Sequence, residues 1–505
     1  MRRNRSLEPF LVLALAAGLS AAGCSKQEAP APARAANSPA PAPPGGGRIP
    51  VTTSSEEARA EFLKGRDDAE KLRITDSIAH FQKAVSLDPG FASAELALAN
   101  SSPTGAEFFE HLRRAVALAD KVSNGERLLI LATEAGANND AAKQKEYLDA
   151  LVAAYPNDER AHFNLGGWYF GQQQYPQAIE QYRKATEIAP DFSTAWNILG
   201  YALRQNGDFA GAEKAFQKYI ELIPKDPNPY DSYAELLLKM GRFDDSIAQY
   251  RKALEIDPNF LNAHQGIAMD LLYSGKAAEA AAELADVAKK ARNDGERRMG
   301  LFALTVVDVD GGKTAKALED ADRNYELGKK TDDVPGMAGA LALKGNILLE
   351  AGKPDPARAE FERALKLIEG SGLSAEVKAN AALVSRFNLG RVAAAKKDFK
   401  TAKSEADAFR QGAEAKKNPA LVRNAHELDG VIALGEKEYD KAIAELQQAS
   451  QQNPQNFYRL SLAYKAKGDA AKAKEYAEKA ANFNSLPQLN YAFVRTKAKA
   501  AAGKG

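Results

Sequence analysis

The sequence is poor in the residue types that build covalent or metal-dependent sites. It contains one cysteine, Cys24, so no disulfide can form within the chain. No apolar run approaches the roughly 20 residues that are needed to cross a bilayer. Basic residues number 68 and acidic residues 67, so the formal net charge of +1 gives no electrostatic reason to expect a nucleic acid partner. The five histidines lack the spacing of a metal-binding motif; they are His80, His111, His162, His264 and His426.

Recognisable catalytic motifs are also missing. We find no Gly-x-Ser-x-Gly elbow, no His-Glu-x-x-His helix and no paired cysteine and histidine. The segment Asp308–Thr314 approaches two motifs, but Val307 stands where a phosphate-binding loop needs glycine, and Lys313 where an EF-hand needs its turn glycine. We interpret it as a turn in which Thr314 caps the next helix. The sequence therefore predicts no catalytic residue, no metal and no cofactor, and hence no enzyme.

The first 23 residues have the organisation of a signal peptide. A basic start, Met1–Arg5, is followed by the apolar run Phe10–Leu19 and by the small residues Ser20–Gly23, directly before Cys24. This end resembles the lipobox of bacterial lipoproteins, although Ala21 stands where leucine is usual. The resemblance implies that Cys24 carries a lipid anchor in the bacterial outer membrane, with the protein facing the periplasm. The alternative is an ordinary secretory signal, cut at about the same place, that leaves a soluble periplasmic protein.

Residues 24–57 follow as a segment rich in proline and alanine. Such a composition has no apolar face with which to form a core, so the segment is expected to be a linker between the membrane and the folded part. Helical hairpins are expected from residue 58 onwards.

A repeat of 34 residues dominates the rest of the chain. Pro156, Pro190, Pro224 and Pro258 are each 34 residues apart. Aligning the four segments also brings small residues, aromatic residues and glycines into common columns. The small residues suit two closely packed helices, and Gly207, Gly241 and Gly275 share a place where a left-handed backbone ends a helix. The pattern predicts an all-α chain of helical hairpins.

These columns resemble the tetratricopeptide repeat (TPR). The resemblance implies a right-handed superhelical solenoid over residues 58–487, with about eleven or twelve hairpins that are most regular at 159–294. Residues 488–505 depart from the repeat and are expected to form a C-terminal cap and a basic tail. Each hairpin of such a solenoid touches only its neighbours, and the first helix of each lines a concave surface that serves as the usual binding site.

The positions that face this surface in the family form our candidate site. They are Arg160, Phe163, Asn164, Phe170, Asn197, Tyr201, Arg204, Asp231, Glu235, Met269 and Tyr273. The family's carboxylate clamp requires a lysine column, which here holds Phe163, Asn197, Asp231 and Gln265, so we do not expect that mechanism.

The leading hypothesis is a non-catalytic, lipid-anchored scaffold that binds a protein or peptide in the groove. A lipoprotein that captures peptides or glycans is the alternative, and an enzyme with an unrecognised site is a third class. The oligomeric state stays open.

Overall fold

The computed structural model describes residues 47–71, 73–102, 105–138, 140–291, 294–373, 375–416 and 418–503. The expected signal peptide and Cys24 lie outside these residues. Within the described ranges the chain forms 26 α-helices, one 3-10 turn at Ala119–Lys121 and no strand. None of the helices in these ranges has both the length and the apolarity that a membrane crossing requires. The all-α fold predicted from the 34-residue period is confirmed.

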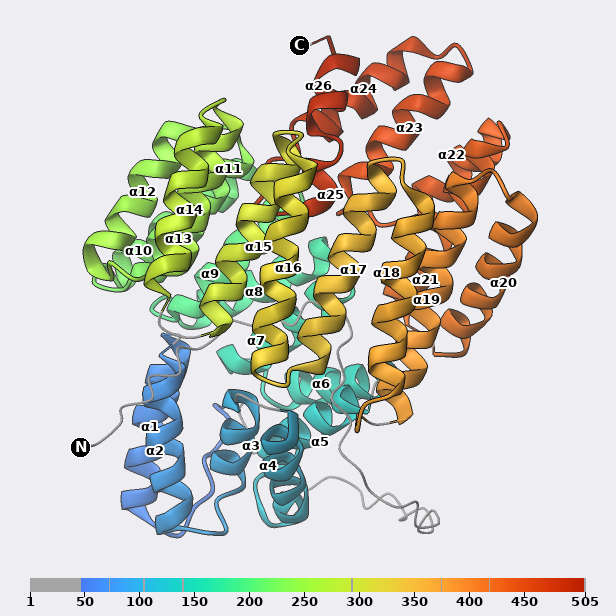
Figure 1. Ribbon diagram of the computed structural model, residues 1–505. Helices are drawn as coiled ribbons and strands as arrows, with labels where there is room; N and C mark the ends of the chain where they lie inside the picture. Colours follow the sequence, from blue (N-terminus) through green and yellow to red (C-terminus); the bar gives the residue numbers. More distant parts are fainter. Residues whose placement is uncertain are drawn as a thin grey trace. The chain divides into compact units, whose positions relative to one another are not determined.

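The chain divides into two compact units, Met1–Tyr233 and Ala234–Gly505. Figure 1 shows the helices in chain order. Unit 1 holds α1 (Glu56–Glu70), α2 (Ile74–Leu87), α3 (Ala92–Ser101), α4 (Gly105–Leu118), α5 (Asn124–Ala137), α6 (Ala141–Ala154), α7 (Glu159–Gly171), α8 (Tyr175–Ile188), α9 (Ser193–Gln205) and α10 (Phe209–Leu222). The unit boundary falls within α11 (Pro227–Lys239).

Unit 2 continues the array. Its helices are α12 (Phe243–Ile256), α13 (Leu261–Tyr273), α14 (Ala277–Lys290), α15 (Asp294–Asp310), α16 (Thr314–Lys330), α17 (Val334–Glu350), α18 (Pro354–Glu369), α19 (Ala375–Ala395), α20 (Phe399–Ala415), α21 (Pro419–Gly435), α22 (Tyr439–Gln448), α23 (Pro454–Ala466), α24 (Ala470–Ala481), α25 (Leu489–Ala492) and α26 (Arg495–Ala501). In the described part of the chain, α1 to α24 pair as twelve consecutive hairpins.

Small residues let the two helices of a hairpin approach closely. A Cβ built at Gly166 would lie 2.8 Å from Cε1 of Tyr182, and one built at Gly200 would lie 2.6 Å from Cε1 of Phe216. The aromatic ring of the second helix therefore lies directly over the glycine of the first. Both rings are buried, so each hairpin carries its own piece of core.

The proline column and an aromatic column are joined by a repeated hydrogen bond. Trp196 Nε1 donates to the Pro190 carbonyl at 2.9 Å, and the Tyr230 hydroxyl donates to the Pro224 carbonyl at 3.0 Å. His162 Nε2 takes the same role toward Pro156 at 3.0 Å. Because a carbonyl oxygen can only accept, the histidine must carry its proton on Nε2. This bond ties the start of each first helix to the turn before it.

Glycines end the first helices as the sequence predicts. Gly207 and Gly275 have φ values of +85° and +87°, a conformation that glycine adopts without steric cost. The turn predicted within the segment Asp308–Thr314 lies at residues 311–313, because α15 continues to Asp310 and α16 begins at Thr314. Thr314 is the first helical residue rather than the cap, because the N-cap position falls on Lys313.

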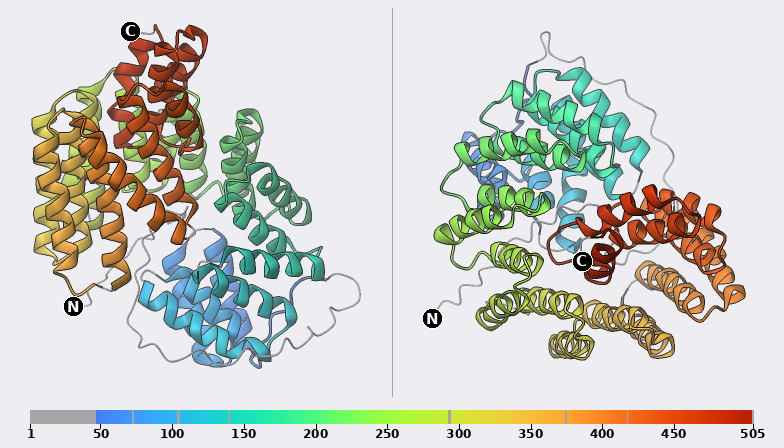
Figure 2. Two further views of the ribbon diagram at one scale, coloured as in Figure 1. Left: turned by 90° about the vertical axis from the view of Figure 1, so that its right-hand side faces the viewer. Right: turned by 90° about the horizontal axis from the view of Figure 1, so that it is seen from above.

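The C-terminal segment packs against the inner side of unit 2. Helix α25 contacts α15 and α23, and α26 contacts α24 (Figure 2). Tyr491 and Val494 are buried, with Tyr491 in the core cluster of α13 to α15. The segment expected to cap the end of the array thus also joins helices that are far apart in the sequence.

Candidate functional site

The concave side of unit 1 holds a cavity of about 390 Å³. Helices α1, α3, α5 and α7 contribute to its walls, and the start of α9 closes it. Phe62, Phe163 and Phe192 supply aromatic surface, while Arg66 and Arg160 supply positive charge. A mostly apolar cavity with a few converging polar groups is typical of a ligand-binding site.

Arg160, at the start of α7, links this helix to α1. Its Nη2 lies 2.6 Å from Oε1 of Glu70 at the end of α1, and Glu159 is its second partner. Burial opposes the charge of Arg160, but Glu70 and Glu159 outweigh it and raise the pKa of the guanidinium. Its Cζ also lies 5.5 Å from the ring centroid of Phe192. The guanidinium therefore stays charged and holds α1 to α7.

Arg66 is the less strongly held of the two cations. Its Nε is 3.9 Å from Glu70, and its Cζ is 5.7 Å from the ring centroid of Phe62. Burial lowers the pKa of Arg66, with the charge of Arg160 adding to the effect. Two neighbouring guanidinium groups thus share one close carboxylate in this part of the cavity.

The chain's own residues Arg48–Ser54, which we call the strap, lie at the cavity, and Arg48–Val51 form part of its lining. The Ile49 N–H donates to Asp158 Oδ2 at 2.8 Å, and the Thr52 N–H donates to Glu126 Oε1 at 2.9 Å. The Thr52 hydroxyl donates to Glu126 Oε2 at 2.5 Å. The linker expected up to residue 57 therefore ends earlier, because these residues are fixed on the helices and α1 begins at Glu56.

The carboxylates that hold the strap also cap helices. Asp158 Oδ1 accepts from the N–H groups of Arg160 and Ala161 at the start of α7, while Oδ2 accepts from the strap. Glu126 forms a capping box with Ser123 at the start of α5. Both carboxylates are nearly inaccessible to solvent, at 2% and 3% exposure. Sequence reasoning missed them because helix capping already explains an acidic residue at these positions.

Two of the residues predicted for the site, Arg160 and Phe163, line the cavity. Asn164 and Phe170 face a neighbouring recess of about 410 Å³ on α7, which Trp168 also lines. Asn164 Nδ2 donates to the Arg160 carbonyl within its own helix, and Phe170 is buried. The first hairpin of the regular block is thus where the predicted groove and the observed cavity coincide.

The predicted residues of the next hairpins in unit 1 form a separate cluster. The Tyr201 hydroxyl donates to Ser232 Oγ at 3.2 Å, and the Arg204 Cζ lies 4.7 Å above the Tyr201 ring. Asn197 and Asp231 are buried. These side chains pack α9 against α11, so only part of this set is open to a partner.

In unit 2 the predicted residues are covered. Met269 is fully buried and Tyr273 is 7% exposed, with Tyr491 packed on the Tyr273 ring at 5.4 Å between centroids. The Tyr273 hydroxyl donates to the Ser485 carbonyl at 2.8 Å. Glu235, on α11, is half-buried. Met269 and Tyr273 therefore face the core, since the C-terminal segment lies over them.

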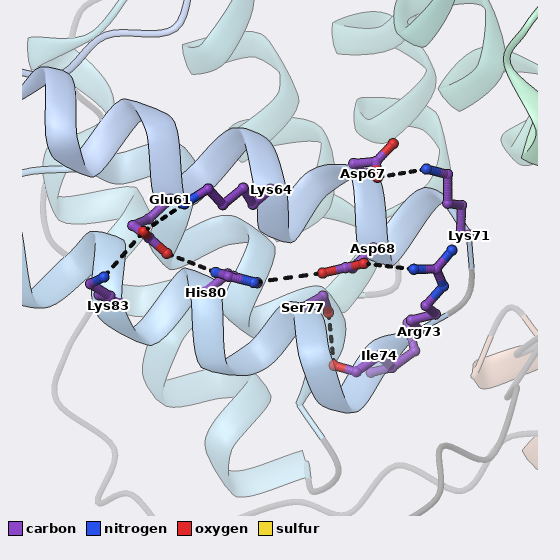
Figure 3. A network of polar contacts seen from close by, with 10 residues as sticks. All are labelled: Glu61, Lys64, Asp67, Asp68, Lys71, Arg73, Ile74, Ser77, His80 and Lys83. Carbon is purple, nitrogen blue, oxygen red and sulfur yellow. Dashed lines mark hydrogen bonds and ion pairs between the residues drawn. The ribbon is translucent and has the colours of Figure 1, made fainter.

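The histidines act within hairpins. His80 lies between Glu61 and Asp68, with its Nδ1 2.7 Å from Glu61 Oε2 (Figure 3). His80, then Lys64 and Lys83, lower the pKa of Glu61 to about 2. Three further histidines contact a carboxylate in the same way; the pairs are His111–Glu95, His264–Glu283 and His426–Glu445. Over the described ranges, no group of three or more histidine or acidic side chains is arranged to hold a metal.

The fold and this concave face together define an α-helical repeat protein with a recessed inner surface. Residues 131–191, 169–227, 203–265, 338–370 and 454–485 match tetratricopeptide repeat families. A TPR repeat-containing protein of Pseudomonas aeruginosa is 30% identical over 73 residues, which cover 14% of this chain and 70% of that protein. The chain belongs to the tetratricopeptide repeat family.

This chain spans only a small part of the length of other curated relatives. The heat shock protein sti1 homolog of Schizosaccharomyces pombe is 30% identical over 89 residues, covering 16% of this chain and 15% of that protein. The protein O-mannosyl-transferase Tmtc1 of Drosophila melanogaster is 33% identical over 100 residues, covering 19% and 12%. Among solved structures, a tetratricopeptide repeat protein from Parabacteroides merdae has a TM-score of 0.38 at 17% identity, covering 52% of this chain and 98% of that one.

Proposed function

We propose that this protein is a non-catalytic scaffold that binds a partner protein through the concave side of unit 1. The observation that carries the proposal is the cavity of about 390 Å³, in which aromatic and guanidinium groups converge on the face that repeat arrays use for binding. Tyrosine, tryptophan and arginine dominate protein interfaces energetically, and phenylalanine contributes apolar area in the same way.

A double substitution in the cavity tests this proposal. Arg66→Ala with Phe163→Ala removes one cation and one ring but leaves the Arg160–Glu70 bridge in place. Crosslinking in intact cells, followed by affinity capture and mass spectrometry, is expected to recover one protein that the double variant loses. Lys184→Ala with Lys218→Ala, on the exposed sides of α8 and α10, is the matched control and is expected to retain it. A partner kept by both variants would place its binding surface elsewhere and overturn the proposal.

We further propose that Cys24 anchors the protein by a lipid in the outer membrane, on the periplasmic side. The support is the sequence: the one cysteine of the chain follows a basic start, an apolar run and small residues. Cys24→Ala is expected to move the protein from the membrane fraction to the soluble fraction. Unchanged retention by membranes would remove the anchor from the proposal and leave the scaffold intact.

Capture of a small peptide or glycan is the second candidate. It is favoured by the recess on α7, where Trp168 stands beside the amides of Gln144 and Asn164. Saturable binding of a glycan by the purified protein, lost on Trp168→Ala, would support this function over the scaffold. An absence of saturable binding would leave the recess as packing around α7.

A further inference from the structure

We propose that the strap is a resident ligand of unit 1, and that the partner segment binds by displacing it. The segment is inferred to be extended, with a basic residue, β-branched apolar residues and serine or threonine hydroxyls. This inference deepens the proposed function and rests on it.

The strap fits the repeat because its contacts follow the hairpins one by one. Ser54 reaches the carboxylate of Asp88 in the turn before α3, Thr52 that of Glu126 in the first turn of α5, and Ile49 that of Asp158 at the start of α7. An extended chain advances about 3.3 Å per residue, so two or three residues span about 7–10 Å. Packed helices are about 8–10 Å apart. An extended segment can therefore place one backbone donor at every hairpin of this face.

Recognition of the strap is partly independent of its side chains. The backbone N–H groups of Ile49 and Thr52 donate hydrogen bonds to carboxylates that are almost fully buried. Any extended segment in the same register offers the same donors. A carboxylate that accepts from backbone N–H groups makes charge-assisted hydrogen bonds, which are about twice as strong as neutral ones.

The side-chain contacts then select the chemistry. Ile49 fits tightly, since a Cβ added to Gly125 would lie 2.8 Å from its Cγ2, and Val51 packs on the apolar cluster around Phe62. Arg48 lies 3.3 Å from Glu159. The Thr53 hydroxyl donates to Asp88 at 2.6 Å. These pockets accept a basic, β-branched and hydroxyl-bearing sequence.

Acidic segments are disfavoured on this face. Asp88, Glu126, Asp158 and Glu159 all present carboxylates to the strap. A carboxylate brought to the same place would meet like charges in a partly desolvated site, which is unfavourable. The surface therefore differs from one that grips an acidic peptide.

The strap is held in a way that permits exchange. Every residue from Gly47 to Ser55 is exposed or half-buried, and none is buried. If the strap leaves, water or a partner can satisfy Glu126 and Asp158. Because the strap is joined directly to α1, it acts at a high effective concentration and lowers the apparent affinity of any competitor.

The test uses the full-length chain and a labelled synthetic peptide with the sequence of residues 47–55. Thr52→Pro in the chain removes both the N–H and the hydroxyl that Glu126 accepts. The Thr52→Pro chain is expected to bind the peptide at least about tenfold more tightly than the wild type in fluorescence anisotropy, since its own strap no longer competes. A peptide carrying the same proline is expected not to bind.

Gly47→Pro is the matched control, because nothing lies within 4 Å of a Cβ built at Gly47. It is expected to behave as the wild type. Ile49→Asp is a second releasing variant, which puts a carboxylate into the apolar cluster of Leu128 and Tyr155 on which Ile49 packs, and changes no residue of a helix. Equal peptide affinity in wild-type and releasing variants, or equal binding of both peptides, would overturn the inference.

The same experiment separates this inference from the proposed function. If the peptide fails to bind a folded releasing variant while a cellular partner is still captured through the cavity, the strap is not a resident ligand and the scaffold stands. If the peptide binds as expected and no partner is captured, the groove is a peptide site and the scaffold proposal falls. Circular dichroism of each variant verifies that the helices are retained.

Discussion

The two units of this protein each have a non-repeat segment across the first helices of their hairpins, and they hold it very differently. In unit 1 the strap is bound by side-chain carboxylates, and none of its residues is buried. In unit 2 the C-terminal segment contributes Tyr491 and Val494 to the core, at 1% and 3% exposure. The same type of concave surface is thus covered by an exposed or half-buried segment in one unit and filled by buried side chains in the other.

Polar contacts strengthen the difference. Unit 2 fixes its C-terminal segment with Arg495, which makes a two-pronged ion pair to Asp310 in which both side chains are shielded from water. On the inner side of the same unit, Gln455 reaches Glu350 at 3.0 Å, and Arg459 reaches Glu427 at 2.8 Å. The Gln455–Glu350 bond joins α23 to α17 across 105 residues, and the Arg459–Glu427 pair joins the neighbouring hairpins of α23 and α21. The C-terminal segment is therefore fixed in unit 2 by a shielded ion pair as well as by its core contacts.

The largest expected effect separates the two coverings directly. Tyr491→Ala removes a buried ring that packs on Tyr273 and whose hydroxyl donates to the Ala481 carbonyl. We expect a loss of about 3–5 kcal/mol in the free energy of unfolding, as for other buried aromatic residues. Ile49→Ala in the half-buried strap is expected to cost about 1 kcal/mol or less. Chemical denaturation of both variants measures the contrast, and equal losses would show that the strap is part of a core after all.

The second largest expected effect is a pH dependence of stability that comes from a buried carboxyl in unit 2. Burial raises the pKa of Asp270 to about 8, with Asp244 adding to the rise and Ser246 opposing it. An unfolded aspartate has a pKa of about 3.9, so the folded state binds a proton that the unfolded state releases. Stability is therefore expected to fall as pH rises from about 4 to about 8, and to change no further above that.

Asp270→Asn sharpens this expectation. The amide carries no charge, so the variant is expected to lose this pH dependence and to exceed the wild type at pH 8 by on the order of 3 kcal/mol. Denaturation midpoints of the variant and the wild type, measured at pH 5 and pH 8, test this expectation. A wild type with the same stability at both values would show that Asp270 is ionised in the folded protein.

The repeat itself could be predicted in some detail from the sequence. The proline and aromatic columns recur at fixed spacing because each pair makes a hydrogen bond within its own repeat, as in Pro190–Trp196 and Pro224–Tyr230. The glycine column likewise recurs because one position in each repeat has a positive φ, which glycine adopts without steric cost. Contacts confined to one hairpin leave a periodic signal, and periodic signals can be found without a structure.

The strap and the C-terminal covering could not be predicted, because both segments lie outside the repeat and far in sequence from residues they contact. The Ile49 N–H meets Asp158 across 109 residues, and the Tyr273 hydroxyl meets Ser485 across 212. Tyr273 stands at a groove position of the repeat, yet the C-terminal segment buries it. Asp158 is recognisable in the sequence as the N-cap of a helix, but its second hydrogen bond, from the Ile49 N–H, is not. Of the predicted site residues, Arg160 and Phe163 line the cavity of unit 1, whereas Tyr273 is covered by the C-terminal segment of unit 2.

The smallest effect concerns one end of the strap. The Thr53 hydroxyl, together with the Ser54 and Gly90 N–H groups, lowers the pKa of Asp88. Because its folded pKa lies below the unfolded value, this carboxylate stabilises the docked strap above pH 4, and the contribution is lost as pH falls through the folded pKa. Thr53→Val in the chain, which removes the hydroxyl that Asp88 accepts but leaves the peptide unchanged, is expected to weaken docking of the strap by less than about 1 kcal/mol. The result is a few-fold gain in binding of the peptide of residues 47–55 at pH 7. The gain should shrink toward pH 3, where the Asp88 carboxyl is becoming protonated. Equal binding by variant and wild type at pH 7 would mean that the Thr53–Asp88 hydrogen bond contributes nothing to holding the strap, and that Glu126 and Asp158 suffice.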